Sequence, residues 1–562
     1  MRRRKAERGA VRIIDLTNIG RLYRTLRYLK ARQLFGRAAF RLLRPRVDLK
    51  PAPPCRERRG PWVKPAERQQ SQFGARRFKF LNVARDIEEC GWDSPSVEKL
   101  WRYNLHYFDD LNAINARGRH TLHVEFIRDW IQSNRPARGT GWEPYPTSLR
   151  IVNWIKWLSA NAGPIADMQH SLAVQARWLN KHVESHLLGN HLFVNAKALL
   201  FAGLYFEGPE AKGWLQKGRK LIEQQLPEQV LSDGGQFELS PMYHALALED
   251  VLDCLNILLA FDQLSEQVAE LRQIAGKMLL WLRVMTHPDG TLGRFNDTAE
   301  GIAPSNKELE RYAHELGVSA QPLPIEGITH LASSGYIRAA RTDAVVLLDV
   351  ARVGPDYLPA HAHADSLSFE LSVHSTRFIV NGGTSCYGVS PQRQRERSTA
   401  AHSTVELAGT DSSEVWSAFR VGRRAIPISL NIQDWTVTAA HNGYSHLPGK
   451  PIHTRSWTLG DNELRVDDMI GPFAADAVSR FILAPEITLQ LIDSTHWDVY
   501  LRRQRMGSVE VACGSGSLGI ASYAPSFGVT RAVVSLEVTL VNAHSRVIWR
   551  WLARMPLSEC AR

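Results

Sequence analysis

Apolar residues recur at intervals of three and four through the first half of the chain, from about residue 95 to residue 315. This spacing puts them on one face of a helix and predicts a series of amphipathic α-helices. Eight segments fit the pattern: 97–114, 121–133, 148–162, 168–183, 192–206, 211–226, 244–261 and 268–285. Gly- and Pro-containing stretches separate them. We therefore expect an all-α array, either a bundle or helical hairpins curled into a toroid.

The pattern changes after a Pro-containing stretch at residues 319–327. Short runs rich in β-branched residues follow, bounded by turn formers, for example at 344–351, 376–383, 479–485 and 532–542. Such runs are typical of antiparallel strands and predict a β-sandwich. The expected fold class is thus multidomain, α then β. The expected parts are a basic N-terminal segment at 1–50, a helical domain at 51–317 and a sheet domain at 330–555.

Length and composition agree with this division. A chain of 562 residues exceeds what one core usually supports, and 44% hydrophobic with 22% charged residues is typical of a globular protein. The six cysteines are far apart and fit neither a zinc knuckle nor a disulfide framework. The chain has no apolar run long enough for a transmembrane helix, and the N-terminus lacks the apolar stretch of a secretory signal.

The formal net charge of +12 is concentrated at the N-terminus. Residues 1–46 contain fifteen Lys or Arg and two acidic residues, so the rest of the chain carries −1. Nucleic-acid binding by the main body is therefore not expected. Within residues 21–46, apolar residues alternate with basic ones at helical spacing, which suits peripheral contact with an anionic membrane, an acidic polymer or a partner helix. Docking of a basic helix on the main body fits equally well.

Residues 361–371, HAHADSLSFEL, carry the strongest chemical signal. In an extended segment, side chains at i, i+2 and i+4 lie on one face, so His361, His363 and Asp365 would point the same way. Two imidazoles and a carboxylate can bind a metal or transfer protons. Asn381 and His402 end further strand-like segments nearby in the sequence. The alternative is that these histidines only make structural hydrogen bonds.

Three loops of the helical half, 185–197, 233–248 and 287–301, carry polar groups that a packed core does not need. They contain Asn190, His191, Asn195, Asp233, Gln236, Glu238, Tyr243, His244, Asp289, Arg294, Asn296 and Asp297, and segment 142–150 adds Arg150. Each loop alone is consistent with helix capping. Their number predicts a cleft lined by polar side chains.

Five of these motifs, taken in order, resemble the heparinase II/III family of polysaccharide lyases. They are GNHLFVNAKAL at 189–199, GGQFELSPMYHALAL at 234–248, HPDGTLGRFND at 287–297, HAHADSLSFEL at 361–371 and AHSTVEL at 401–407. The resemblance covers the chain from about residue 20 onward. It implies an incomplete α/α toroid followed by an antiparallel β-sandwich. It also implies β-elimination of uronate-containing polysaccharides, such as heparan sulfate or alginate, in the periplasm or cell envelope.

The chemistry of β-elimination explains the residue types. Removing the proton at C5 of a uronate builds negative charge next to its carboxylate, so hydrogen-bond donors must neutralise that group. A base must take the C5 proton, and an acid must protonate the departing O4. By the resemblance, Asn190 and His191 neutralise the carboxylate, while Tyr243 and His361 exchange the protons. Which of the two is the base depends on whether the uronate is glucuronate or iduronate. Substrate contacts are expected from Arg150, Gln236, Glu238, Arg294 and Asn296.

Family members also hold a metal, often zinc, in the sheet domain. By motif, His363, Asn381 and His402 match its ligands, but Asn381 stands where an Asp is usual. An amide is a poor zinc ligand compared with imidazole or carboxylate. Asp365 replaces it only if the strand geometry allows. The sequence thus predicts a zinc site that is weakened at its middle position.

Two other functions fit parts of the sequence. A glycoside hydrolase needs paired carboxylates, for which Glu238 with Asp297 or Asp233 are candidates. A non-catalytic polymer-binding or assembly factor in exopolysaccharide production would fit the missing export signal and the basic N-terminal segment. If the protein is a lyase, the near-neutral body favours an acidic polysaccharide without sulfate.

Overall fold

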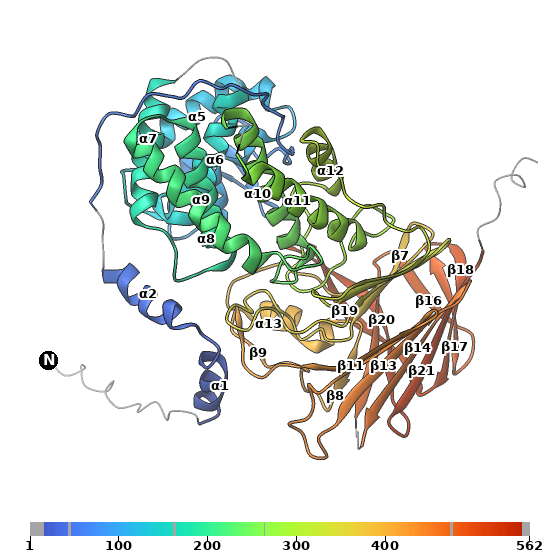
Figure 1. The fold of residues 1–562 in the computed structure, drawn as a ribbon. Coiled ribbons are helices and arrows are strands. Elements are labelled where there is room, and N and C mark those ends of the chain that lie inside the picture. The colour runs from blue at the N-terminus through green and yellow to red at the C-terminus, as the bar shows by residue number, and fades with distance from the viewer. Residues whose placement is uncertain (1–15, 43–45, 161–164, 263–264, 473–475, 554–562) are drawn as a thin grey trace, which may run out of the picture.

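The computed structural model describes residues 16–42, 46–160, 165–262, 265–472 and 476–553. Helices form one half of the molecule and antiparallel sheets the other, with the two halves packed side by side (Figure 1). The last helix of the first half ends at Glu315 and the first strand of the second begins at Gly327. The predicted order, helices first and sheets second, is confirmed.

Each of the eight predicted helical segments contains a helix. The larger helices are α4 (Lys99–Tyr107), α5 (His120–Ser133), α6 (Pro144–Ala160), α7 (Ala166–Lys181), α8 (Gly189–Tyr205), α9 (Pro209–Gln229), α10 (Pro241–Phe261), α11 (Gln267–Val284) and α12 (Asn306–Glu315). The first prediction ran too far, because Phe108 adopts a left-handed φ of 63° and ends α4. Helix α12 and the hairpin of β1 (Arg77–Phe80) and β2 (Val83–Asp86) were not predicted.

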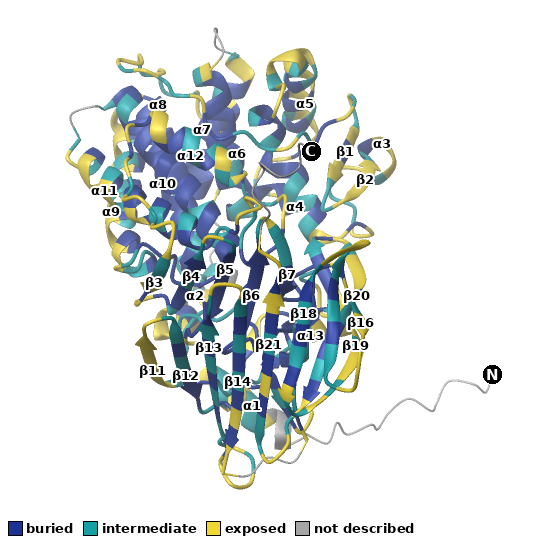
Figure 2. Cartoon of the chain, turned by 90° about the vertical axis from the view of Figure 1, so that its right-hand side faces the viewer, coloured by how far each residue is buried: buried dark blue, intermediate teal, exposed yellow. Residues whose placement is uncertain are grey.

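Helices α8 and α10 form the centre of the helical half. Both are apolar on almost every side, and α8 packs against α6, α7, α9 and α10. Figure 2 shows α10 as almost entirely buried. A helix that is apolar all round must lie inside a core. The N-terminal ends of α8 and α10 therefore hold fixed positions, which matters because the candidate residues lie at those ends.

The sheet half consists of two large antiparallel sheets. The first has the order β19-β20-β15-β7-β6-β5-β4-β3, with β8 paired to β15, and the second the order β11-β12-β13-β14-β21-β18-β17-β16. The first contains β3 (Gly327–Leu331), β4 (Tyr336–Arg341), β5 (Ala344–Asp349), β6 (Phe369–Val373), β7 (Thr376–Val380), β8 (Val405–Leu407), β15 (Ala477–Leu483), β19 (Ser515–Ser526) and β20 (Val529–Thr539). The second contains β11 (Pro427–Gln433), β12 (Thr436–His441), β13 (Ile452–Leu459), β14 (Glu463–Gly471), β16 (Ile487–Leu491), β17 (His496–Leu501), β18 (Gln504–Cys513) and β21 (His544–Trp551).

The two sheets share one core. Phe369 and Phe481 of the first sheet pack with Trp457 and Trp549 of the second. Strand β13 alternates strictly between buried and half-buried positions, as expected for a strand with one face on a core. Strand β19 was not predicted, because it is rich in Gly and Ser rather than in β-branched residues.

The basic N-terminal segment forms two helices, α1 (Leu16–Leu26) and α2 (Ala31–Leu42). We call residues 16–42 the N-terminal arm; it is the dark blue pair of helices in Figure 1. Arg21 and Arg24 of the arm pair with Glu414 of the sheet half, and Lys30 pairs with Glu228 of the helical half. The arm is therefore docked on the main body. Within the described ranges, no helix is both long and apolar enough to cross a membrane.

Candidate active site

A cavity of about 750 Å³ lies where the helical half, the sheet half and the N-terminal arm meet. The four residues predicted to be catalytic all line it, although they come from three separate stretches of sequence: Asn190, His191, Tyr243 and His361. Its size falls within the usual range for small-ligand sites. The fold thus brings the predicted reactive groups to one space.

Asn190 and His191 reach the cavity from the first turn of α8. The turn before them needs a glycine, because Gly189 has a φ of +54° and an added Cβ would lie 2.5 Å from Cδ2 of Leu358. Nδ1 of His191 lies 3.2 Å from Oε2 of Glu184. Burial lowers the pKa of His191, but the Glu184 carboxylate outweighs it and the net shift is upward. The helix N-terminus and this imidazole both favour an anion.

Tyr243 lies in the first turn of α10. Ser240 caps this helix, since its Oγ accepts a hydrogen bond from the Tyr243 backbone N–H at 3.2 Å. The Tyr243 hydroxyl lies 3.1 Å from the hydroxyl of Tyr387, and its ring stacks on the His361 ring at a centroid distance of 3.9 Å. Burial and then the neighbouring Tyr387 raise the pKa of Tyr243 well above 10. The phenol therefore keeps its proton at neutral pH.

His361 lies in a loop ahead of the predicted strand, because β6 begins only at Phe369. Its Nδ1 lies 2.9 Å from Oδ2 of Asp297, and its Nε2 lies 3.5 Å from Oε2 of Glu238. The predicted common face nevertheless exists. Nε2 of His363 lies 2.9 Å from Oδ1 of Asp297, and Asp365 accepts a hydrogen bond from the neighbouring backbone N–H of residue 296.

Asp297 is fully buried and anchors this arrangement. Both of its oxygens accept hydrogen bonds from the Arg393 guanidinium, and Thr384 Oγ1 donates to Oδ1 at 3.2 Å. Burial raises the pKa of Asp297, but Arg393 and the two imidazoles hold it well below its ordinary value. An ionised carboxylate only accepts hydrogen bonds, so Nδ1 of His361 is its protonated nitrogen. In the neutral ring, Nε2 is then free to accept a proton.

The same geometry argues against a hydrolase. Asp297 is ionised, buried and held by Arg393, so it can neither donate a proton to a glycosidic oxygen nor reach one. Asp233 accepts hydrogen bonds from the backbone N–H groups of Ser333 and Ser334 at 2.9 and 2.7 Å. Neither carboxylate can therefore pair with Glu238 across a substrate, as paired-acid hydrolysis requires.

Arg150 and Gln236, two of the residues expected to bind substrate, lie inside the protein. Arg150 is fully buried and donates to Oε1 of Gln175 at 3.0 Å and to the carbonyl of His106 at 3.2 Å. Gln236 is buried and donates to Oε1 of Glu238 at 3.2 Å. Of the five residues in this group, Glu238 is the one that lines the cavity.

Arg294 and Asn296 are also buried and hold the loop that carries Asp297. Arg294 donates to the Tyr523 hydroxyl at 2.9 Å. The Asn296 amide donates to the carbonyl of Leu239 at 2.9 Å and accepts from the backbone N–H of His363 at 3.0 Å. The geometry thus gives these two side chains structural contacts in place of the expected substrate contacts.

Hydrogen bonds within the protein engage the three expected zinc ligands. Nδ1 of His363 lies 3.2 Å from Nε2 of His402, a hydrogen-bond distance between the two rings. Oδ1 of Asn381 accepts the backbone N–H of Ser403 at 3.0 Å, and Asp365 is held by a backbone N–H. No group of three His, Cys, Asp or Glu side chains suited to a metal occurs among the described residues.

Several charged and aromatic residues of the cavity were not predicted from the sequence. Tyr145 packs on His191 at 4.4 Å, and Tyr387 reaches Tyr243 from a loop of the sheet half. Three cations of the cavity wall are paired with acids: Arg68 with Glu249, Lys156 with Asp253, and Lys197 with Asp250 and Asp253. This part of the wall is therefore charged but close to neutral overall.

Two family descriptions match this chain. The heparinase II/III N-terminus matches residues 24–315, and the heparinase II/III-like C-terminal domain matches residues 325–551. A heparin-sulfate lyase of Bacteroides stercoris is 25% identical over 452 residues, which cover 70% of this chain and 65% of that protein. A heparin-sulfate lyase of Pedobacter heparinus is 25% identical over 368 residues, covering 59% and 55%. The aligned regions thus span less than two thirds of either relative.

Solved structures show the same fold. A crystal structure of heparinase III matches with a TM-score of 0.65 and 17% identity, covering 82% of this chain and 78% of that one. A mutant heparan sulfate lyase from Pedobacter heparinus matches with a TM-score of 0.58 and 18% identity, covering 93% and 88%. The predicted architecture, a toroid of helices followed by a β-sandwich, is confirmed by this likeness.

Proposed function

Because the chain belongs to the heparinase II/III family, we propose that it is a polysaccharide lyase that cleaves uronate-containing polymers by β-elimination. One observation carries the proposal. An amide, an imidazole of raised pKa, a protonated phenol and an imidazole with a free Nε2 line one cavity: Asn190, His191, Tyr243 and His361. These are the groups that carboxylate neutralisation, proton removal and proton donation require.

In the proposed reaction, Nε2 of His361 takes the C5 proton of the uronate. The electron pair of the C–H bond forms the C4–C5 double bond, and the bond between C4 and O4 breaks. Asp297 lies 2.9 Å from Nδ1 of the ring and Glu238 lies 3.5 Å from Nε2, so both carboxylates stabilise the imidazolium that forms. Asn190 and His191 face the uronate carboxylate and offset its charge as the enolate develops.

Tyr243 is the proposed acid. Its raised pKa keeps the phenol protonated before the reaction, and its hydroxyl proton passes to O4 as the leaving group departs. The stacking of its ring on His361 keeps the two proton-transferring groups next to each other. One product then carries an unsaturated uronate at its new non-reducing end, and the other keeps the former O4 as the anomeric hydroxyl of a new reducing end. Proton exchange with solvent restores both side chains.

We further propose that the substrate is an acidic polysaccharide with little or no sulfate. The relatives are named heparin-sulfate lyases, but four of the seven Lys and Arg residues that line the cavity here are paired with acids: Arg68, Lys156, Lys197 and Arg424. Arg68, Lys156 and Lys197 are each neutralised by acids of the same wall. Dense sulfation needs clusters of cations that are free to pair with it. A wall close to neutral suits a polymer whose charge is limited to its carboxylates.

The test is release of conjugated unsaturated ends, followed by ultraviolet absorbance, from alginate, hyaluronan, chondroitin, heparan sulfate and bacterial exopolysaccharides. We expect absorbance to rise with at least one low-sulfate polymer and to be lost in His361→Ala. Saturated new ends would instead indicate hydrolysis. If no polymer is cleaved, the lyase proposal is contradicted. A non-catalytic assembly factor in exopolysaccharide production would then be the better explanation.

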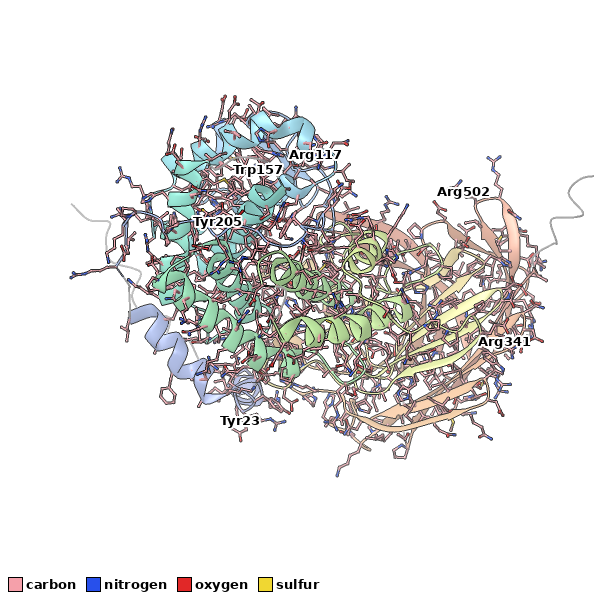
Figure 3. All side chains as sticks on the ribbon, turned by 45° about the horizontal axis from the view of Figure 1, so that its top comes forward. Tyr23, Arg117, Trp157, Tyr205, Arg341 and Arg502 are labelled. Atoms are coloured by element: carbon pink, nitrogen blue, oxygen red, sulfur yellow. The ribbon has the colours of Figure 1, made fainter. Side chains whose placement is uncertain are left out.

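The outer face of the N-terminal arm supports one further proposal, peripheral contact with an anionic membrane. Tyr23 is 68% exposed and Phe35 76% exposed, and Figure 3 shows Tyr23 pointing outward from the arm. Arg27, in the turn after α1, and Arg32, in α2, are exposed as well. Aromatic and basic side chains on one surface are typical of helices that lie on anionic lipid.

A further inference from the structure

The N-terminal arm and residues 414–424 of the sheet half form one continuous surface beside the cavity. Nε1 of Trp416 donates to Oγ1 of Thr25 at 3.2 Å, and Nε of Arg24 donates to Oε2 of Glu414 at 2.9 Å. Both segments also contribute side chains to the cavity wall. A polymer that leaves the cavity on this side therefore meets the arm and the sheet half together.

This surface is rich in arginine. We call five of its residues the arginine cluster: Arg21, Arg24, Arg420, Arg423 and Arg424. Within the described ranges, two acids pair with members of the cluster: Glu414 with Arg21 and Arg24, and Asp356 with Arg424. Five guanidinium groups against two carboxylates leave the cluster with a net positive charge.

The guanidinium groups of the cluster are crowded and incompletely hydrogen-bonded. Those of Arg21 and Arg420 lie over the same Trp416 ring, 5.8 and 4.6 Å from its centre. Nε of Arg423 and Nε of Arg424 are buried and have no hydrogen-bond partner in the part of the chain that the structure describes. Cations held close together, with donors left unpaired, favour an anionic ligand.

The arginine cluster lies next to the candidate catalytic residues. Arg420 and Arg424 both line the cavity, and Arg420 is exposed. Phe419, the residue before Arg420, has its ring 5.9 Å from the ring of His361. An acidic sugar chain that runs from His361 past Phe419 therefore brings the carboxylates of its next units to the arginines.

We propose that the arginine cluster is a second binding site for the polysaccharide, which holds the carboxylates of sugar units beside the one that is cleaved. This inference rests on the proposed substrate class, an acidic polysaccharide, and extends its binding beyond the catalytic residues. Guanidinium groups suit this role because they pair with carboxylates through two parallel hydrogen bonds. It also gives docking of the arm a function, since α1 supplies Arg21 and Arg24.

The test is binding of alginate and of hyaluronan to the full chain carrying His361→Ala, which should bind polymer without cleaving it. Adding Arg420→Gln and Arg423→Gln should weaken binding about tenfold and make it less sensitive to salt. Adding Arg420→Lys and Arg423→Lys keeps both charges and should leave affinity within about threefold of the parent. Neutral dextran should bind to none of these proteins.

A matched control removes the same charge elsewhere. Arg502 and Arg503 are exposed, and Figure 3 shows Arg502 far from Tyr23 of the arm. Arg502→Gln with Arg503→Gln should therefore leave affinity unchanged. Equal losses in this control and in Arg420→Gln with Arg423→Gln, or no loss in either, would overturn the proposal. So would a parent protein that binds neither acidic polymer, or that binds dextran equally well.

Three outcomes separate this proposal from the others. Unsaturated ends from the native enzyme, with polymer binding that does not depend on Arg420 and Arg423, would overturn the arginine site and leave the lyase proposal standing. Binding that depends on both arginines, without unsaturated ends from any polymer, would support the site and overturn the lyase proposal. A loss limited to anionic vesicles would assign these arginines to the membrane contact and overturn the polysaccharide site.

Discussion

Tyr243 and Tyr387 allow the proposed acid to be separated from a structural tyrosine. Their hydroxyls share one hydrogen bond of 3.1 Å, so Tyr243→Phe and Tyr387→Phe each remove the same interaction. A net hydrogen bond is worth about 1 kcal/mol, and both variants should lose about that much stability. Only Tyr243 stacks on His361 at 3.9 Å. Loss of a general acid should slow Tyr243→Phe by about 10² to 10⁴, or about 3 to 5 kcal/mol in activation free energy.

The assay is the initial rate of ultraviolet absorbance at saturating polymer, with thermal unfolding of both variants measured in parallel. We expect equal losses of stability and unequal losses of rate, with Tyr387→Phe within about tenfold of the native rate because it loses positioning only. Equal rates in the two variants would refute the assignment of Tyr243 as the acid. A Tyr387→Phe variant slower than Tyr243→Phe would transfer the role to Tyr387.

Four other predictions follow from the structure. Asp297→Asn should lower the free energy of unfolding by about 3 to 5 kcal/mol in denaturant titrations, because it leaves the Arg393 charge buried and unpaired; unchanged stability would contradict the network. Gly189→Ala should destabilise the protein by about 1 kcal/mol or more and reduce the rate, since its Cβ would meet Leu358; native melting and activity would show that the turn relaxes. Chelation should leave the rate unchanged and metal analysis should find no stoichiometric zinc, whereas a rate lost on chelation and restored by zinc would reinstate the metal site. Phe35→Glu should weaken sedimentation with anionic vesicles, while neither the native protein nor the variant should sediment with neutral vesicles. Equal sedimentation of the two proteins with anionic vesicles would show that this face of the arm does not bind the membrane.

The sequence predicted the fold well where one period dominates. Helix α9 buries residues at intervals of three and four, such as Trp214, Gly218 and Ile222, and β13 alternates strictly, so both types were recognisable. The errors occur where a single residue ends an element, or where the composition of a strand is not typical of strands. Phe108 takes a left-handed φ and ends a helix whose apolar pattern continues, and a Gly-rich strand such as β19 carries no β-branched signal. Local patterns thus identify elements more reliably than their ends.

The candidate site was predictable only in part, because its residues meet through the fold. Asn190, Tyr243 and His361 were found through short motifs, each at the start of a helix or ahead of a strand. Arg393 was missed because its partner, Asp297, lies 96 residues away along the chain. Arginines and amides in the same loops were expected to face substrate. Sequence alone does not reveal that such groups are buried and already hydrogen-bonded.

The Asp297 network makes assembly of the site depend on docking of the two halves. The carboxylate comes from the helical half, while His361, His363 and Arg393 come from the sheet half. Ser240 Oγ donates to the Asp297 carbonyl at 2.6 Å, so the same loop also fixes the first turn of α10. Separation of the halves would leave buried charges unpaired on both sides and would move the imidazole away from the phenol. Loss of docking should therefore abolish catalysis while each half retains its own hydrophobic core, and activity should fall before secondary structure during gradual denaturation.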